Sequence, residues 1–259
     1  MEEESVLYKV DDRIGWITIN WPEKMNRLTF GTIWELVRTI ERAEEDDKVR
    51  VLVITGAGGK AFCAGGGIDQ MKAGSAAVTL KENLEALARL FLVFRRISKP
   101  SIAMIDGYAV GGGCSLAMAP TFGIASETAV FGYPEIKNGI WPMVVMPILV
   151  RTVGRKKGLE LMSTGDLIDA REAERIGMIN KVVPREELKP HVVELANKLI
   201  SKSGSILKFG LEVFHEAEDM DYEKAVTYLK NMALLLFNNP DFVEGTRAFL
   251  EKRSPKWNN

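Results

Sequence analysis

The order of hydrophobic and polar positions predicts an α/β fold with buried strands. Residues 14–20, IGWITIN, alternate apolar and polar side chains, and the strand-like VLYKV precedes them, so a hairpin is expected. Residues 49–56, VRVLVITG, form a continuous apolar run that ends at glycine, and SIAMIDG after Pro100 is a second such run. Runs of this kind are typical of strands that are covered on both faces, and they favour a parallel sheet.

Helical periodicity appears in two segments between these strands and dominates the last third of the chain. Thr29 precedes a segment, 30–46, whose apolar side chains recur on one face: Ile33, Leu36, Val37 and Ile40. Residues 80–97 predict a second amphipathic helix, and 170–184 a short helix followed by a strand. From Glu186 onward the pattern is helical, with interruptions at Ser203-Gly204 and Asn239-Pro240.

These patterns divide the chain near residue 195. Residues 1–195 are expected to form the α/β core, and residues 196–259 a helical region. The helical region carries an apolar stripe at Ala233, Leu234, Leu236 and Phe237. Such a stripe fits packed core and a contact between subunits equally well.

Composition excludes several classes of function. The 259 residues include 34 Lys and Arg against 35 Asp and Glu, so the near-neutral chain gives no reason to expect a nucleic-acid partner. The acidic segment MEEESVLYKV does not predict a signal peptide, and the apolar runs are too short to predict a membrane span. Cys63 and Cys114 lie among small apolar residues, which predicts buried, reduced thiols, a cytoplasmic location and no zinc site.

The segment GYAVGGGCSLA, residues 107–117, resembles the turn that carries a nucleophilic serine. Ser115 would need a base, and the two histidines, His191 and His215, both lie on polar segments near the C-terminus. The motif also ends in alanine at Ala117, where hydrolases carry glycine. The pattern therefore favours a functional role for the glycines of this segment and not for Ser115.

A second motif, Gly56-Ala57-Gly58-Gly59-Lys60-Ala61, matches the dinucleotide-binding pattern G-x-G-x-x-A. The pattern normally follows the first strand and opens into a helix, with an acidic residue about 20 positions later. Here it follows a hairpin and a helix and leads into FCAGGG, without that acid. The context argues against a nicotinamide or flavin enzyme.

Two glycine-rich loops form the third motif. Residues 64–67 follow one buried strand, and residues 111–113 follow the next. In neighbouring parallel strands both loops emerge at the carboxyl edge of the sheet, where open sheets bind ligands. One N–H group from each loop would then suit a single oxygen, as in an oxyanion hole.

Taken together, the motifs resemble those of the crotonase superfamily, the enoyl-CoA hydratase and isomerase fold. The resemblance covers nearly the whole chain and rests on motifs in the family's order: 22–26 (PEKMN), 60–65 (KAFCAG), 106–113 (DGYAVGGG), 131–135 (FGYPE), 160–165, 170–183 and 249–253 (FLEKR). It implies a spiral of strand–strand–helix units followed by helices that build a trimer, often paired into a hexamer. It also implies that Gly66 and Gly112 bind the carbonyl oxygen of an acyl-CoA thioester and stabilise its enolate.

The resemblance further indicates which acids are present. Family members that hydrate enoyl-CoA use two glutamates, and this chain has Ser115 at the first position and Glu135 at the second. The hydratases also carry a glycine-rich loop that helps to hold water, and at that place this chain has a segment that includes Met143. Gly67 stands where the family usually has an acidic residue, directly after the first amide donor. A single acid at the second position is the arrangement of the Δ3,Δ2-enoyl-CoA isomerases, so isomerisation is expected over hydration, with apolar neighbours raising the pKa of Glu135.

The remaining expected contacts with the substrate or its CoA moiety follow from the same resemblance. They are Met25, Ala64, Gly65, Gly67, Ile68, Gly111, Pro134, Trp141 and Met143, with Phe249 and Lys252 on a C-terminal helix that meets CoA, in some members that of a neighbouring subunit. No metal or redox cofactor is expected, because coenzyme A arrives as part of the substrate.

Three alternatives stay open at this point. One is an enoyl-CoA hydratase in which Ser115 orients water and Glu135 makes both proton transfers. Another is a different crotonase-type reaction of an acyl-CoA, such as decarboxylation, dehalogenation or thioester hydrolysis. The third is an acyl-CoA-binding oligomeric scaffold without catalysis. Acyl chain length, pathway, and the choice between trimer and hexamer cannot be derived from the sequence.

Overall fold

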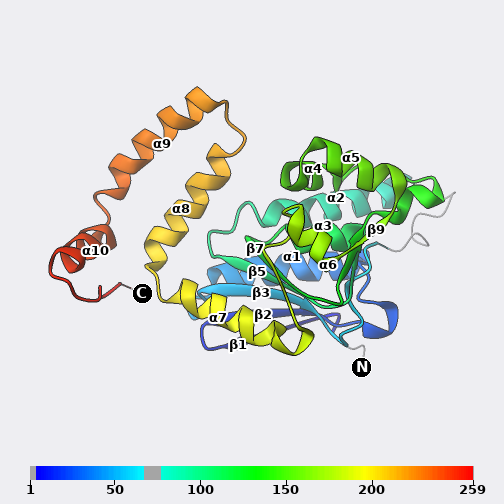
Figure 1. Cartoon of the computed structure of the whole chain (residues 1–259), viewed down its shortest axis with the longest axis horizontal. Helices are drawn as coiled ribbons and strands as arrows, with labels where there is room; N and C mark the ends of the chain where they lie inside the picture. The colour runs from blue at the N-terminus through cyan, green and yellow to red at the C-terminus, as the bar shows by residue number, and fades with distance from the viewer. Residues whose placement is uncertain (1–3, 67–76, 259) are drawn as a thin grey trace.

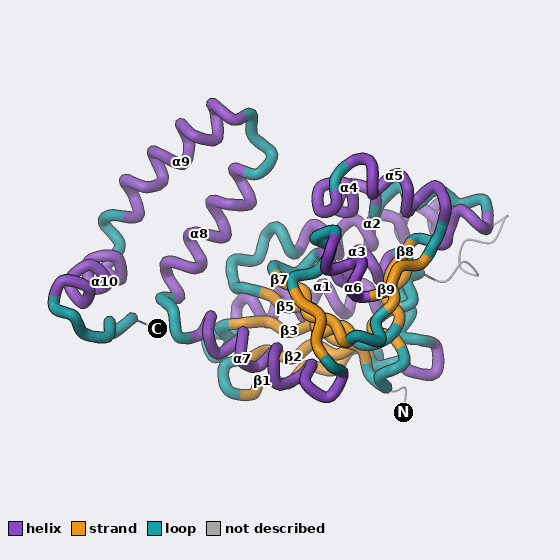
Figure 2. The backbone as a smooth tube through the Cα atoms, viewed as in Figure 1, coloured by secondary structure: helices purple, strands orange, loops and turns teal. Residues whose placement is uncertain are grey.

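The computed structural model describes residues 4–66 and 77–258, in a rounded α/β body with an arm of helices at one side (Figure 1). The arm consists of α8 (Gly204–Ala217), α9 (Tyr222–Leu236) and α10 (Pro240–Leu250). Figure 2 shows that the strands gather in the body, whereas the arm is made of helices and short connections.

The larger sheet begins with the expected hairpin. Its order is β1 (Val6–Asp11), β2 (Ile14–Ile19), β3 (Val51–Gly56), β5 (Ser101–Ile105), β7 (Phe122–Ser126) and β10 (Lys181–Val183). The β1–β2 pair is antiparallel, and every other neighbouring pair in this sheet is parallel. The predictions of a hairpin and of parallel buried strands are confirmed.

The continuous apolar run in β3 is explained by two separate layers of core. Leu52 and Ile54 lie in the hydrophobic cluster that includes α1 (Phe30–Glu45) and α2 (Ala77–Val93). Val51 and Val53 point to the other face, where they pack with α7 (Leu188–Ile200). Because successive side chains of a strand alternate between faces, a strand with helices on both sides needs an apolar residue at every position.

The two predicted helices between the strands are present, with different bounds for the second. The Thr29 hydroxyl caps α1 by accepting from the backbone N–H of Thr32, and the predicted apolar face of α1 is buried. By contrast, α2 ends at Val93, before the expected end at residue 97. Phe94 and Ile97 are still buried, but Phe94 lies in a turn and Ile97 directly after it, so their apolar character reflects burial and not helical structure.

A smaller second sheet was not predicted from the sequence. It consists of β4 (Ala61–Cys63), β6 (Tyr108–Val110), β8 (Val130–Gly132) and β9 (Leu167–Asp169), in that order. β3 and β4 lead to α2, and β5 and β6 lead to α3 (Gly112–Met118). β7 and β8 lead to the short 3-10 helix η3 (Pro134–Asn138) and then to α4 (Met146–Val153), so strand, strand and helix recur.

This arrangement also decides the dinucleotide hypothesis. β3 ends at Gly56, and the following turn leads into β4 and not into a helix. The segment therefore lacks the strand–loop–helix context that binds a pyrophosphate. The structure thus agrees with the sequence context in giving no support to a dinucleotide-binding loop.

The rest of the chain completes the body and forms the arm. The remaining elements of the described residues are η1 (Pro22–Lys24), α5 (Arg155–Thr164), α6 (Ala170–Arg175) and η4 (Arg185–Glu187). α6 and β10 confirm the helix–strand pair that was predicted over 170–184. The expected division at residue 195 falls inside α7, and the arm begins after it; a division into two domains stays a prediction.

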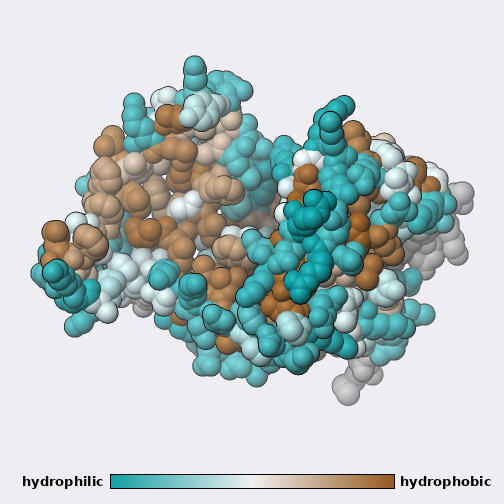
Figure 3. Space-filling view, viewed as in Figure 1, coloured by the Kyte–Doolittle hydropathy of each residue, from teal (hydrophilic) through white to brown (hydrophobic). Residues whose placement is uncertain are grey.

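The breaks at Ser203-Gly204 and Asn239-Pro240 are confirmed, because Ser203 and Asn239 cap α8 and α10. A further break at 218–221, between α8 and α9, was missed. Figure 3 shows hydrophobic side chains gathered over the arm. Within the ranges that the structure describes, none of the helices has the length and apolar character needed to cross a bilayer.

Candidate active site

The two glycine loops lie against each other, but they follow the small sheet and not the large one. The first loop comes after β4 and the second after β6, and these two strands are parallel neighbours. Gly65 has a φ of +74°, and a Cβ there would lie 2.7 Å from the carbonyl oxygen of Val110. A Cβ on Gly113 would lie 1.9 Å from the carbonyl oxygen of Cys63. Glycine is therefore required for the loops to approach this closely.

Gly66 and Gly112 occupy the point where the loops meet. A Cβ on Gly112 would lie 3.8 Å from the amide nitrogen of Gly66, and a Cβ on Gly65 would lie 3.0 Å from the amide nitrogen of Gly112. Gly112 is the first residue of α3, so the helix offers its N–H no carbonyl four residues earlier. The structure thus brings together the two residues whose amides were expected to act as a pair.

The turn at residues 22–26 holds the first loop in place. The Ala64 N–H donates to the Met25 carbonyl at 3.0 Å. Asn26 is fully buried, accepts from the Trp21 N–H and donates to the carbonyls of Ala57 and Ala61. Asn26 was noticed only as part of the motif PEKMN, and its central role depends on contacts 31 and 35 residues away in sequence.

Glu135 lies directly beside the second loop. It sits in η3 after Pro134, and a Cβ on Gly111 would lie 2.5 Å from its Oε1 atom. Its Oε2 atom is buried and has no hydrogen-bond partner in the described part of the chain. Burial raises the pKa of Glu135, because removal from water disfavours the charged carboxylate. The expected direction of that shift is therefore found.

Ser115 has a different environment from the one expected. Its hydroxyl lies 2.7 Å from that of Tyr133, and both residues are 0% exposed. His191 and His215 lie on α7 and α8, where their imidazoles contact Glu187 and Glu218. Ser115 is thus neither paired with a histidine nor open to solvent, which argues against a nucleophile and against direct orientation of a water molecule.

Of the three residues expected to form an apolar wall near Glu135, Trp141 and Val144 are partly buried and Met143 is exposed. Trp141 packs against the main hydrophobic cluster. Met143 is 66% exposed, because the turn after Trp141 directs this position outward. In the single chain Met143 therefore does not fill an enclosed space. Gly67 and Ile68, also expected at the site, lie outside the described residues.

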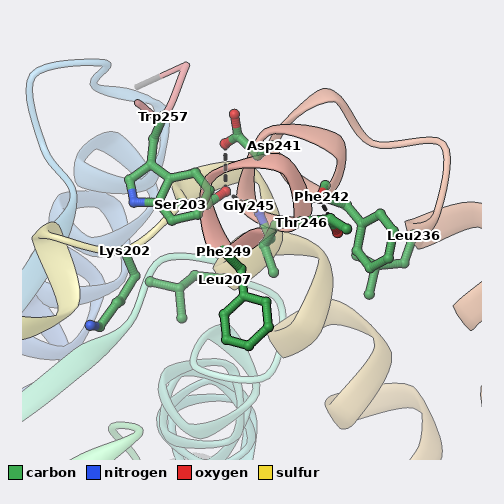
Figure 4. Close-up of a pocket in the computed structure, with 11 residues that line it drawn as sticks. Lys202, Ser203, Leu207, Leu236, Asp241, Phe242, Gly245, Thr246, Phe249 and Trp257 are labelled. Carbon is green, nitrogen blue, oxygen red and sulfur yellow. Dashed lines mark hydrogen bonds between the residues drawn. The ribbon is translucent and has the colours of Figure 1, made fainter. Parts of the chain in front are cut away.

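Phe249 and Lys252 lie at the far end of the arm. Figure 4 shows Phe249 beside a cavity of about 500 Å³ that Leu207, Phe242 and Trp257 also line. Phe249 is 81% exposed, and Lys252 follows α10. Figure 1 places α10 at the outer end of the arm, away from the body that holds α3 and β6, so the arm of the same chain does not bring these residues to the glycine loops.

Comparison with known proteins agrees with this fold and site. The family model described as "Enoyl-CoA hydratase/isomerase" matches residues 9–259. A "Probable enoyl-CoA hydratase, mitochondrial" of Dictyostelium discoideum is 38% identical over 250 residues, which are 95% of this chain and 88% of that protein. A "Crotonyl-CoA hydratase" of Syntrophomonas wolfei is 35% identical over 254 residues, which are 98% of this chain and 97% of that protein.

Solved structures give the same result for the fold. The crystal structure of an enoyl-CoA hydratase from Mycobacterium smegmatis aligns with a TM-score of 0.95 and 28% identity, over 99% of this chain and 100% of that one. The shared fold has two mixed sheets and C-terminal helices. The chain belongs to the enoyl-CoA hydratase/isomerase family, with the crotonase fold, and is an enzyme of that family.

Proposed function

We propose that this enzyme acts on enoyl-CoA thioesters, with Glu135 as its acid–base group and the amides of Gly66 and Gly112 as donors to the thioester oxygen. The observation that carries this proposal is the Glu135 carboxyl, which packs against Gly111 with a buried and unpartnered Oε2 atom. A carboxylate oxygen without a partner is available to take a proton from a bound substrate.

The two parts of the site have complementary tasks. Amide donors stabilise the negative charge that develops on the thioester oxygen, and removal of one such donor costs about 2.7–4 kcal/mol of barrier in other enzymes. The enolate that forms makes a proton on the neighbouring carbon acidic enough for a carboxylate to move. The raised pKa of Glu135 strengthens it as a base and keeps it able to return the proton.

Hydration of a 2-enoyl-CoA is the net reaction that the curated relatives favour, since both of those described above are named hydratases. In this reaction Glu135 takes a proton from water as the oxygen bonds to the β-carbon. The electrons of the double bond move to the thioester oxygen, and the carboxyl then gives its proton to the α-carbon. The expectation that isomerisation predominates finds no support in those names.

Isomerisation of a 3-enoyl-CoA is the second candidate, and the Ser115–Tyr133 pair favours it. Where the two-glutamate hydratases carry their first acid, this chain has a serine whose hydroxyl is already bonded to Tyr133. Glu135 would then take a proton from the α-carbon, and the double bond would shift as the same proton returns at the γ-carbon. One base that reaches both carbons is sufficient.

Product analysis separates the two reactions and the scaffold alternative. The protein is incubated separately with a 2-enoyl-CoA and a 3-enoyl-CoA, and the products are followed by mass spectrometry with reference standards. Hydration adds the mass of water to the 2-enoyl ester, whereas isomerisation moves the double bond without a change of mass. Binding of both esters without turnover would support the scaffold alternative and contradict the proposal.

Substitution Glu135→Gln tests the proposed base directly. We expect kcat to fall at least about 100-fold, because general acid–base catalysis by one group typically contributes that much. The matched control is Glu127→Gln, which changes an exposed glutamate at the end of β7. Full activity of Glu135→Gln in a folded protein would remove Glu135 from the mechanism.

The substrate and its CoA moiety are expected to contact the residues around this point. The residues expected to be provided by the same chain as the site are Met25, Ala64, Gly65, Gly111, Pro134, Trp141 and Met143. Phe249 and Lys252 lie on the arm, so a contact of theirs with CoA would involve the site of a neighbouring copy in a homotrimer or a hexamer. The mechanism uses no metal and no redox group.

A further inference from the structure

We propose that Ser115 and Tyr133 are positioning residues, whose hydrogen bond fixes the Glu135 carboxyl relative to the amide of Gly112. The inference rests on the proposed function, because it requires Glu135 to be the acid–base group. It assigns Ser115 a role that does not include contact with the substrate, and it assigns a role to Tyr133, whose place in the motif FGYPE alone indicated none.

The pair joins the two segments that carry the chemistry. Ser115 lies in α3, three residues after Gly112, and Tyr133 immediately precedes η3, two residues before Glu135. Their hydroxyl oxygens are 2.7 Å apart. The bond therefore runs directly from the helix that begins with the proposed amide donor to the segment that holds the acid.

A second bond makes this connection rigid. The Gly111 N–H donates to the Gly132 carbonyl at 2.8 Å, one residue before Tyr133. The backbone bond holds the start of the segment, and the hydroxyl pair holds the next side chain along it. Two consecutive anchors restrict the direction in which the chain continues from Tyr133 to Glu135.

The carboxyl itself lacks comparable support. Among the described residues no other side chain bonds to the Glu135 carboxyl, which has a hydrogen bond with its own backbone and a buried Oε2 atom without a partner. The position of the acid thus depends on its backbone and on packing against Gly111. Since a displacement of about 1 Å of a catalytic group can lower the rate about 100-fold, anchors of this backbone matter for turnover.

The burial of the pair supports a fixed geometry. Both residues are 0% exposed, so water does not compete for either hydroxyl. Burial also raises the pKa of Tyr133 well above its ordinary value, so the phenol stays protonated and keeps its donor at neutral pH. A buried hydrogen bond that is satisfied on both sides defines one arrangement of its partners.

The test uses Ser115→Ala, Tyr133→Phe and the double variant, each of which removes only hydroxyl oxygens. We expect each single variant to lower kcat about 10-fold, while KM changes less than about 2-fold, because a misplaced acid affects turnover more than binding. The Tyr133 hydroxyl also bonds to the Cys114 thiol, so Tyr133→Phe removes two contacts. The double variant is therefore expected to have the kcat of Tyr133→Phe, because Ser115→Ala breaks a bond that Tyr133→Phe has already removed.

The control is Ser101→Ala, which removes a buried hydroxyl paired with Thr121 at the beginning of β5, at the opposite ends of the strands from the glycine loops. This variant should lower the melting temperature without lowering kcat. Each variant is assayed below its own melting temperature, and a variant that does not fold is replaced in the comparison by the other single variant.

The outcomes separate this inference from the proposed function. If Glu135→Gln abolishes turnover while Ser115→Ala and Tyr133→Phe keep the wild-type kcat, the positioning role is wrong and the base is retained. If KM rises in the two variants while kcat stays at the wild-type value, the pair affects binding and not the placement of Glu135, and the positioning role is also wrong. If Glu135→Gln keeps full activity, the proposed function fails first.

Discussion

At the scale of single residues, the most informative group is a carboxyl with one buried oxygen that has no hydrogen-bond partner among the described residues. Glu135 is half-buried, its Oε2 atom is enclosed, and burial raises its pKa. Charge in such a place opposes folding, because the unfolded chain hydrates the carboxylate better. The residue that makes the site reactive is therefore expected to make the protein less stable, and the two effects can be measured separately.

The stability of Glu135→Gln should depend on pH in a defined direction. Because the folded pKa is raised, the folded protein binds the proton of Glu135 more tightly than the unfolded chain. The wild type then loses stability relative to the variant as pH rises through the raised pKa. Urea unfolding at about pH 4 and about pH 8 should show a gain for Glu135→Gln only at the higher pH.

An equal increase in the free energy of unfolding at both pH values would show that packing, and not ionisation of Glu135, causes the difference between variant and wild type. The other titratable groups are present in both proteins, so their contributions cancel when the two are compared.

The contact between Gly111 and Glu135 gives a second prediction at this scale. Gly111 has a φ of +56°, and a Cβ there would lie 2.5 Å from Oε1 of Glu135. Gly111→Ala should therefore displace the acid and lower kcat about 10- to 100-fold. The control is Gly210→Ala in α8, where a Cβ meets nothing within 4 Å. Wild-type turnover by Gly111→Ala would mean that the carboxyl is not needed at this position.

At the scale of elements, the glycine loops depend on the turn that Asn26 organises. Its buried side chain connects the turn at residues 22–26 with the carbonyls of Ala57 and Ala61, on either side of the connection between β3 and β4. The same turn receives the Ala64 N–H through Met25. One amide side chain thus links three segments that lead to the first loop.

Removal of this side chain should destabilise the fold. Asn26→Ala leaves the Trp21 N–H and two carbonyls without their partner, and an unsatisfied buried polar group costs about 1–3 kcal/mol. We expect the free energy of unfolding to fall by about that amount in urea titrations. The exposed Asn197→Ala in α7 serves as control and should change it by less than about 0.5 kcal/mol. An equal effect of both substitutions would contradict the role of Asn26.

Elements with long, regular patterns could be predicted from the sequence. The alternation over residues 14–20, the face of α1 and the apolar run of β3 each reflect contacts that one element makes with one or two layers. The strands of the small sheet span three residues each, which is too short for a period to appear. The sequence therefore indicated the glycine loops but not the strands that carry them.

The same distinction applies to the site. Gly66, Gly112 and Glu135 were identified through motifs, and the structure places the loops and the acid side by side. The partner of Ser115 could not be identified, because Tyr133 is 18 residues away and its hydroxyl reaches Ser115 only through the pairing of β6 with β8. The outward direction of Met143 likewise depends on a local turn that residue type does not specify.

At the scale of the whole molecule, the arm exposes more apolar surface than a solitary chain is expected to tolerate. Leu234 is 59% exposed and Phe237 is 52% exposed, both in the apolar stripe seen in the sequence. Other exposed apolar side chains on the arm include Phe214, Tyr222, Val226, Phe249 and Leu250. The stripe thus favours a contact between subunits over packed core, and a homotrimer or hexamer stays a proposal.

Self-association should depend on this stripe. Leu234→Lys places a charge where a neighbouring copy is expected to bury apolar surface, so the assembly should dissociate toward single chains. Sedimentation velocity over a range of concentrations measures the change, and Glu223→Lys, at an exposed polar position of α9, is the control. If the wild type sediments as a single chain at all concentrations, the proposed assembly is wrong.

The cellular location also stays a prediction. Cys63 and Cys114 are buried free thiols, as expected for a reducing compartment. The relative from Dictyostelium discoideum is named as mitochondrial.

The distribution of the site over the strand–strand–helix units has a consequence for how activity arises during folding. Gly66 follows β3 and β4, Gly112 follows β5 and β6, and Glu135 follows β7 and β8. Each successive turn of the spiral contributes one part, so the site is complete only when all three units have packed together. Recovered turnover should consequently lag behind recovered circular dichroism when the denatured enzyme refolds.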